Sequence, residues 1–552
     1  MVSQEEFKSI LQASCRFLNQ NDLTSLALTS KSVCHSIAVQ QLYHSISITR
    51  DPVIRSNECL LDAGRTYVSG YRALKKTDDQ NDLFLYDRIE RLMESSKLQH
   101  VKEIDIQDSL FSDEECGNLL IRKFLDRVIE LDKIESIDIR NDHLFLEHYP
   151  NILGLTNLKK IKIVDTDALS KIRSFSKLKK IEWIVEQPRL TKQLLTPHVV
   201  DFFNKRIEAC EFIVDNINSS SFQIIQFFYE NGIQCENLRS LKFNHLYGIN
   251  VHSEHHKDAS LKWLKDVVCL EKLKTLELGI SSENIDHDLI DDFLEELAPH
   301  LKSLRNLALI ETTPEQNSDC TLKEVWDLTI NRFILRIPDI GLNLHTLSIS
   351  HKTPLNGLCS SAVQGNYTRR RVLYETVLPK LTSLRNLIAP NMLQSLSVYE
   401  VLACDILWNG CECSYCKKVL PVFDEYIMNH QYYSRYNGRY MDIIPTVFFS
   451  YAGDYLSRRF NNRVEWDTKV FDTAPLYRCW NFRGYEQIHH FDNYEDLFDE
   501  SAFGPLCKVI SHFFNGYMDY LVKFLPNLEM AMFSGIYYTI DKEANTYECI
   551  YD

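Results

Sequence analysis

The feature that most constrains the fold is a short leucine-rich pattern that recurs along the chain. Nine stretches read L-x-x-L-x-x-L-x-L with substitutions, from LQHVKEIDI at Leu98 to LTSLRNLIA at Leu381. The final L-x-L of each stretch predicts a short strand, and the earlier leucines bring the chain around a turn. Because such a unit can bury its leucines only against its neighbours, the pattern predicts a solenoid with a parallel sheet.

The spacing of the repeats is irregular, so helices of unequal length are expected between them. Residues 222–229, 288–297 and 324–335 have the apolar periodicity of helices, as does the stretch that carries Phe84, Ile89, Leu92 and Met93. The last 150 or so residues are rich in Tyr, Phe and Trp. Within them, the segment from Leu521 resembles a terminal repeat, and an aromatic-rich cap would cover the last apolar face of the solenoid.

The run from Phe17 to Ile48 predicts two short amphipathic helices. Asn21 or Asp22 can cap the first helix, and Thr29 or Ser30 can cap the second. Helices this short cannot bury their apolar faces on each other alone. They need a partner, which is either the rest of the chain or another protein.

The order of signals in this run, DLxxLALTSKxxxxxxxxxLY, resembles the F-box, a module that docks on a Skp-type adaptor. The resemblance implies an apolar docking surface that includes Leu18, Leu23, Leu26, Val33, Ile37 and Leu42. F-box modules usually open with Leu-Pro, whereas this chain reads SQEEFKSIL. The missing proline argues against recruitment of a cullin. The alternative is a plain helical hairpin that caps the solenoid.

Composition is that of an ordinary globular chain with two to four structural units. The 552 residues are 45% hydrophobic and 25% charged, and the net charge is −15. The Lys and Arg residues are scattered and form no basic stripe, which argues against a nucleic-acid-binding protein. No apolar run long enough for a membrane span and no signal peptide are visible. The 16 cysteines are mostly solitary, as in reduced intracellular proteins, so a cytoplasmic location is expected.

One cysteine cluster stands apart, in CDILWNGCECSYC. Three thiolates at Cys411, Cys413 and Cys416 could point at one Zn²⁺, with Cys404 as the fourth ligand of a closed structural site. His430 is a poorer fourth ligand, because a helix from residue 417 would carry it about 20 Å away. Reduced cysteines without metal and redox chemistry are the alternatives. No other cofactor is expected.

No enzyme motif is found, so no catalytic residue is predicted. The phosphate-binding loops G-x-x-x-x-G-K-[ST] and G-x-G-x-x-G are absent, as are H-E-x-x-H and G-x-S-x-G. The sharpest basic run, Arg369 to Arg371, is expected to be a solvated helix start or a contact for an acidic partner. The chain is therefore predicted to be a binding protein.

Six stretches narrow the resemblance to fungal F-box proteins of the non-SCF type, which restrain an endosomal Rab GTPase of the Ypt class: FLNQNDL, TYVSGYR, NDLFLYDRIERL, CDILWNGCECSYC, YIMNHQYY and TYECIYD. The resemblance implies a Skp-type adaptor as partner, no cullin, and repression of the GTP-bound Rab in endosome-to-vacuole sorting. The motif I-x-x-D-x-x-R of GTPase-activating proteins is absent, so sequestration or blocked exchange is favoured over faster hydrolysis.

The predicted fold class is α/β, an N-terminal helical F-box followed by an irregular leucine-rich-repeat-like solenoid with a mixed, aromatic-rich C-terminal cap. The predicted segments are 1–50 for the F-box-like helices, 51–97 for a linker and helix, 98–395 for the solenoid and 396–552 for the cysteine-containing cap. Two other functions stay open. One is a substrate receptor of a cullin ubiquitin ligase, and the other is a repeat scaffold without adaptor binding.

Overall fold

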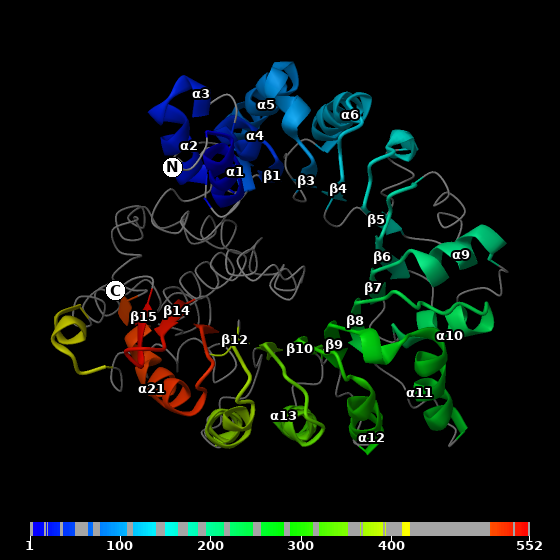
Figure 1. Ribbon diagram of the computed structural model, residues 1–552, viewed down its shortest axis with the longest axis vertical. Helices are drawn as coiled ribbons and strands as arrows, with labels where there is room; N and C mark the ends of the chain where they lie inside the picture. The colour runs from blue at the N-terminus through cyan, green and yellow to red at the C-terminus, as the bar shows by residue number, and fades with distance from the viewer. Residues whose placement is uncertain are drawn as a thin grey trace, which may run out of the picture. The chain divides into compact units, whose positions relative to one another are not determined.

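The structure is a computed structural model in which the chain forms two compact units. Figure 1 labels the helices and strands that are described below. The first unit is mainly Met1–Asp215 with Glu230–Asn237, and the second takes Asn216–Tyr229 and most of the chain after Leu238. The structure describes residues 4–15, 18, 20–33, 37–49, 65–69, 78–106, 114–139, 150–163, 175–185, 195–214, 221–246, 255–280, 288–312, 320–351, 365, 368–389, 392, 411–419, 508–509, 511–533 and 536–549.

Parallel strands form the sheet of the first unit, in the order β2-β1-β3-β4-β5-β6-β7. The strands are β1 Ser45–Thr49, β2 Arg65–Ser69, β3 Glu103–Ile106, β4 Ser136–Ile139, β5 Lys160–Ile163, β6 Lys180–Val185 and β7 Ala209–Val214. From β3 onward each strand lies beside the next one in sequence, which is the order that a stacked repeat produces.

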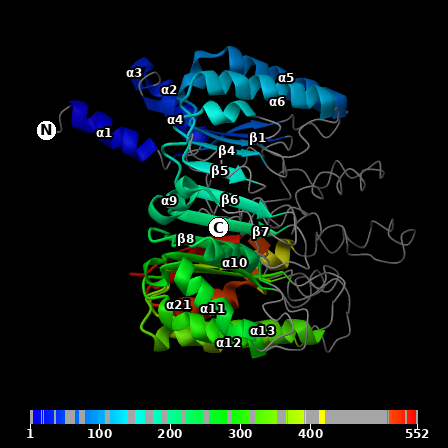
Figure 2. The same ribbon diagram turned by 90° about the vertical axis from the view of Figure 1, so that its right-hand side faces the viewer.

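Helices α5 Asp78–Glu94, α6 Glu114–Glu130 and α9 Pro197–Lys205 cover one face of this sheet, together with the short 3₁₀ turns η4 Ser96–His100 and η5 Pro150–Gly154. Four further helices precede β1: α1 Gln4–Ser14, α2 Gln20–Thr29, α3 Lys31–Val33 and α4 Val39–Leu42. Helices α5 and α6 lie side by side (Figure 2). The opposite face of the sheet is called the inner face below.

The second unit repeats this construction and ends differently. Parallel strands β8 to β13 are followed by the antiparallel strands β14 and β15. The strands are β8 Ser240–Leu246, β9 Thr275–Ile280, β10 Asn306–Glu311, β11 Thr346–Ser350, β12 Asn386–Ala389, β13 Met530–Phe533, β14 Ile536–Asp541 and β15 Thr546–Cys549. The antiparallel pair extends the sheet beyond the last leucine-rich stretch.

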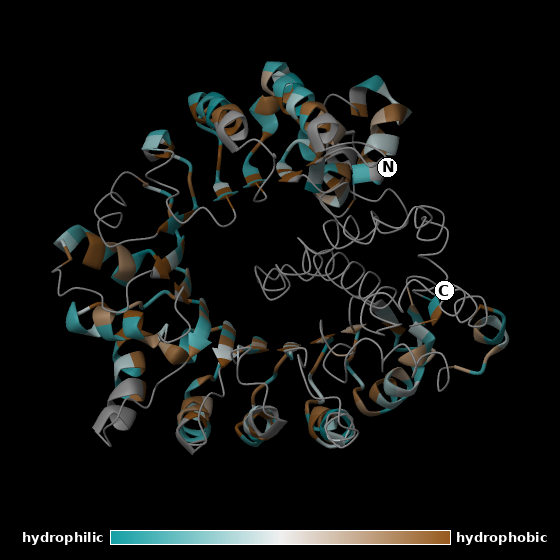
Figure 3. Ribbon diagram, turned by 180° about the vertical axis from the view of Figure 1, so that it is seen from behind, coloured by the Kyte–Doolittle hydropathy of each residue, from teal (hydrophilic) through white to brown (hydrophobic). Residues whose placement is uncertain are grey.

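The helices of the second unit are amphipathic, with both hydrophobic and hydrophilic surface (Figure 3). In α12, Phe293 and Leu294 are buried, whereas the next residue, Glu295, is exposed. The helices are α10 Phe222–Glu230, α11 His255–Val267, α12 Asp288–Leu297, α13 Cys320–Asp339 and α21 Asn515–Phe524, with the short turns η7 Leu270–Lys272, η8 Ala298–His300, η9 Leu373–Val377 and η10 Leu378–Lys380.

Leucines at equivalent repeat positions stack on each other from strand to strand. Leu276 pairs in register with Leu241 on one side and with Leu307 on the other, and all three are at most 1% exposed. In several repeats a backbone hydrogen bond closes the turn before the strand, such as Leu304 N–H to the Leu301 carbonyl and Leu384 N–H to the Leu381 carbonyl, at 3.1 and 2.9 Å. The repeat therefore specifies both the strand and the turn that leads into it.

All nine stretches that carry the leucine-rich pattern end on a strand, and the segment from Leu521 supplies β13. The prediction of an α/β chain is confirmed, and its long, mostly parallel strand arrangement is compatible with a solenoid-like body. The four predicted helices correspond to α5, α10, α12 and α13. Strands β1, β2, β7, β14 and β15 were not predicted, and β1 and β2 lie upstream of the first leucine-rich stretch.

The basic run in the second unit corrects an expectation. Arg369 Nε and Arg370 Nη1 both donate to the carboxylate of Asp327 on α13, at 2.7 and 2.6 Å. The side chains of Asp327 and Arg370 are only 6% and 3% exposed. The run is therefore not a solvated helix start, because two of its arginines neutralise a buried carboxylate. Arg371 alone is exposed, and it pairs with Glu375 one turn along.

Candidate functional site

Helices α1 to α4, here called the N-terminal helical region, have a small core of their own. Cys15, Leu23 and Ile37 are buried at its centre, and partly buried leucines pack around them: Leu11, Leu18, Leu26 and Leu42. Burial in this apolar setting raises the pKa of the Cys15 thiol. The cluster explains how helices this short persist, because each of them packs against its neighbours.

Serine caps the second short helix, as predicted. Ser30 Oγ accepts a hydrogen bond from Val33 N–H at 3.1 Å, and α3 begins at the next residue. The predicted cap of the first helix is wrong. Helix α2 already begins at Gln20, so Asn21 and Asp22 lie in its first turn. There the negative charge of Asp22 interacts favourably with the positive end of the helix dipole.

The N-terminal helical region joins the sheet directly. Helix α4 ends at Leu42, and β1 begins three residues later, at Ser45. In addition, Gln20 Oε1 accepts a hydrogen bond from Tyr67 N–H in β2 at 3.2 Å. The region is therefore attached to the sheet at both β1 and β2.

The residues predicted to contact an adaptor fall into two groups. Leu23 and Ile37 are buried, at 0% and 4% exposure, so in this chain they hold the helices together. The remaining four are partly exposed: Leu18, Leu26, Val33 and Leu42. Two further apolar side chains are mostly exposed, Ile10 at 58% and Leu28 at 83%, and neither was among the predicted adaptor contacts. Several apolar side chains of this region are thus at least partly exposed.

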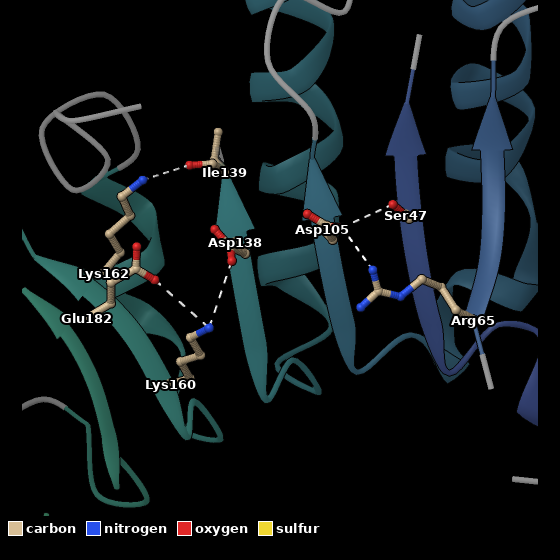
Figure 4. A network of polar contacts seen from close by, with 8 residues as sticks. All are labelled: Ser47, Arg65, Asp105, Asp138, Ile139, Lys160, Lys162 and Glu182. Atoms are coloured by element: carbon tan, nitrogen blue, oxygen red, sulfur yellow. Dashed lines mark hydrogen bonds and ion pairs between the residues drawn. The ribbon is translucent and has the colours of Figure 1, made fainter. Parts of the chain in front are cut away.

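On the inner face of the first unit, strands β3, β4, β5 and β6 each carry a charged side chain between two buried apolar residues (Figure 4). Asp105 on β3 accepts hydrogen bonds from Ser47 Oγ on β1 and from Arg65 Nη1 on β2, both at 3.1 Å. Three adjacent strands are thereby joined across their inner face. A charged residue here can point only toward the inner face, since its two neighbours in the strand are buried beneath the helices.

The next strands continue this row of charges. Lys160 Nζ lies 3.8 Å from Asp138 and 4.0 Å from Glu182, so one cation bridges β4, β5 and β6. Lys162 Nζ donates to the Ile139 carbonyl at 3.2 Å. The residues drawn in Figure 4 form a row of polar contacts and ion pairs between neighbouring strands. Such a row suits polar recognition of a partner.

The cysteine cluster lies beside a residue that the sequence pattern did not reveal. Cys411, Cys413 and Cys416 come together with His512, and their ligand atoms all lie within 4.8 Å of one another. His512 Nδ1 is 3.3 Å from Cys413 Sγ and 3.2 Å from Cys416 Sγ. These four residues are called the cysteine–histidine cluster below. Cys404, the predicted fourth ligand, and His430 lie outside the described residues.

The thiols of the cysteine–histidine cluster differ in their acidity. A hydrogen bond from the Cys416 backbone N–H to the Cys413 sulfur, at 3.4 Å, lowers the pKa of Cys413 to about 6. Burial of Cys416 raises the pKa of that thiol. Backbone N–H groups that point at sulfur stabilise a thiolate, which is the form that binds metals.

Comparison with known proteins places the chain among the F-box proteins of the non-SCF type, and the chain belongs to this family. The relative that shows this is the Non-SCF-type F-box protein ROY1 of Saccharomyces cerevisiae. The two are 45% identical over 536 residues, and the alignment covers 97% of each chain. No family model matches the chain. The resemblance inferred from the sequence is thus confirmed at the level of the family.

Among the helices that the structure describes, none combines the length and the apolar character that crossing a bilayer requires.

Proposed function

We propose that the chain is a non-enzymatic F-box protein whose N-terminal helical region binds a Skp-type adaptor. The observation that carries this proposal is the identity to ROY1 along almost the entire chain. Partly exposed Leu18, Leu26, Val33 and Leu42, with exposed Ile10 and Leu28, support it as an apolar docking surface. Burying one such side chain against a partner contributes roughly 1.5–3 kcal/mol.

The proposed complex with the adaptor excludes a cullin. The relative is described as a non-SCF-type protein, so it is set apart from the cullin-containing ligases. The present chain also lacks the Leu-Pro opening that F-box modules usually have in the region of α1. A substrate receptor of a cullin ubiquitin ligase is the alternative function, and it predicts stoichiometric cullin in the purified complex.

The proposed target is a Rab-family GTPase of the Ypt class, held back in its active GTP-bound form in endosome-to-vacuole sorting. This proposal rests on the family resemblance of segments spread from FLNQNDL to TYECIYD. It implies a protein in the cytoplasm that associates with endosomes through its partner. Sequestration of the GTPase or blocked nucleotide exchange is the proposed mechanism, since the sequence lacks the arginine-finger motif I-x-x-D-x-x-R.

The inner face of a leucine-rich-repeat-like solenoid is the proposed surface for the GTPase. Asp105, Asp138 and Lys160 support this, because each is a charged side chain that retains between 13% and 19% exposure on that face. Charges already held in lateral pairs lose little freedom when a partner binds. They would set orientation and specificity more than affinity.

Binding of a Rab GTPase in defined nucleotide states tests this assignment. The purified complex of chain and adaptor should bind the GTPase loaded with a GTP analogue more tightly than the GDP form, without accelerating hydrolysis. Equal binding of both forms, or no binding, would exclude the proposed target. On the inner face, Asp138→Asn should weaken binding, whereas Glu130→Gln on the exposed end of α6 should not. Equal affinity of the two variants for the GTPase would argue against the inner face as the binding surface.

A further inference from the structure

The cysteine–histidine cluster has the ligand set of a structural zinc site. Three thiols and one imidazole are among the ligand sets that close a tetrahedral zinc centre. With bonds of about 2.3 Å to sulfur and about 2.0 Å to nitrogen, tetrahedral ligand atoms lie roughly 3.5–3.8 Å apart. The two sulfur–nitrogen distances, 3.3 and 3.2 Å, require separation by only a few tenths of an ångström.

The local backbone also suits a metal-bound thiolate. Cys413 N–H points at Cys411 Sγ, and Cys416 N–H points at Cys413 Sγ, both at 3.4 Å. Residues 414–419 are helical, so Cys413 precedes the first turn and Cys416 lies within it. N–H groups directed at coordinating sulfur are the outer contacts that orient ligands and reduce their charge.

His512 is held in place by the C-terminal strands. The preceding residue, Ser511, is 1% exposed, and its carbonyl accepts a hydrogen bond from Tyr538 Oη on β14 at 2.8 Å. Two residues further on, Phe514 stacks on Phe533 of β13 at 5.3 Å between ring centroids. The ring of His512 itself packs edge-on against Tyr415 at 5.9 Å. The imidazole is therefore positioned by the fold before any metal binds.

We propose that Cys411, Cys413, Cys416 and His512 bind one Zn²⁺ that joins two distant parts of the chain. Cys416 and His512 are 96 positions apart in sequence, so the metal fastens the 411–416 turn to the segment that leads into α21 and β13. All four ligands come from the protein, and this leaves no open position for a substrate. Soft thiolate ligands in a tetrahedral set select zinc over calcium or magnesium. The site is structural.

Elemental analysis of the full-length chain tests the proposal. The chain, produced in zinc-replete medium without a polyhistidine tag and purified under reducing conditions, should carry about one zinc per molecule. Cys413→Ser and His512→Ala should each lose most of it, and His512→Cys should retain it. The matched control is Cys269→Ser, a partly exposed cysteine elsewhere in the second unit, which should keep the full complement.

Cobalt substitution in the unmodified chain decides the case even when a ligand variant fails to fold. Co²⁺ bound by three thiolates and one imidazole should show the intense visible bands of tetrahedral cobalt and thiolate charge-transfer absorption in the near ultraviolet. Wild-type chain that binds neither zinc nor cobalt with its thiols reduced would overturn the proposal. Zinc retained at full stoichiometry in folded Cys413→Ser and His512→Ala would do the same.

Discussion

The side-chain oxygen of Gln20 accepts a hydrogen bond from the backbone N–H of Tyr67 at 3.2 Å, although 47 positions separate the two residues in sequence. Gln20 is the first residue of α2, and Tyr67 is the middle residue of β2. The bond ties the N-terminal helical region to the edge strand of the first unit. An adaptor bound to these helices would thus be held close to the sheet without a flexible joint at this point.

Loss of this bond should loosen the edge strand. Gln20→Ala leaves Tyr67 N–H without its acceptor, and a neutral hydrogen bond of this kind contributes about 0.5–1.5 kcal/mol. Hydrogen exchange should therefore be faster in the peptide that contains Tyr67. Gln12→Ala, at an exposed position of α1, is the matched control and should leave that peptide unchanged. Unaltered exchange in Gln20→Ala would show that the bond does not hold β2.

Buried and exposed leucines of the N-terminal helical region should behave differently. Leu23→Ala removes a side chain of 0% exposure, so the free energy of unfolding should fall by about 2–5 kcal/mol. Leu28→Glu changes a side chain of 83% exposure, so stability should be retained while adaptor binding weakens. Denaturant titration and adaptor titration separate the two effects.

The control for Leu28→Glu is the same substitution at an exposed leucine outside this region. Leu83 on α5 is 70% exposed, and Leu83→Glu should alter neither stability nor adaptor binding. If both glutamate variants bind the adaptor like the unmodified chain, Leu28 lies outside the contact surface.

Adjacent arginines of the basic run should differ sharply in their effect on stability. Arg370→Ala removes one cation from the buried Asp327 carboxylate, and breaking a buried pair typically costs 3–5 kcal/mol. Arg371→Ala removes a partner from a pair in which the arginine is 74% exposed, and the cost should stay below about 1 kcal/mol. Chemical unfolding of both variants checks this difference. Similar losses at the two positions would contradict the assignment of Asp327 to a buried ion pair.

Acid should remove the contribution of Asp132 to stability. Hydrogen bonds from the Thr156 hydroxyl and N–H, at 2.7 and 2.8 Å, lower the pKa of this carboxyl in the folded state. A carboxyl with a depressed folded pKa stabilises the fold above its unfolded pKa, and the effect is lost as pH falls through the folded pKa. The advantage of the natural chain over Asp132→Asn should therefore shrink below about pH 4.

Urea unfolding of both chains between neutral pH and pH 3 measures this change. Asparagine is the suitable replacement, because Asp132 has a positive φ of 44°, which asparagine tolerates. A constant difference across this pH range would mean that the hydrogen bonds of Asp132 do not depend on its charge.

Local periodicity predicted most of the strands of the sheet. The nine leucine-rich stretches place leucines and isoleucines on strands because each repeat satisfies the same local condition, burial against an identical neighbour. Strands β1, β2, β7, β14 and β15 were not predicted from the repeat. SISIT, RTYVS, ACEFIV, IYYTID and TYEC contain no leucine and do not match the repeat, so only their weaker alternation and β-branched or aromatic residues indicate a strand.

The residues of the candidate sites were harder to predict from the sequence than the strands. Spacing brought Cys411, Cys413 and Cys416 together, but His512 joins them only through the packing of residues near β13 and β14. The pairing of Arg370 with Asp327 likewise spans 43 positions. Contacts of this kind depend on how elements distant in sequence pack together, and no local sequence pattern predicts them.

We expect this F-box protein to bind a Skp-type adaptor through its N-terminal helical region and to do so without a cullin. Affinity purification from the host cells, with blotting for the adaptor and the cullin in one sample, measures both interactions at once. The expected result is stoichiometric adaptor, no cullin, and loss of the adaptor in a folded Leu26→Glu variant. Stoichiometric cullin would identify the chain as a substrate receptor of a ubiquitin ligase instead. Absence of both proteins would mean that these helices only cap the sheet and bind no adaptor.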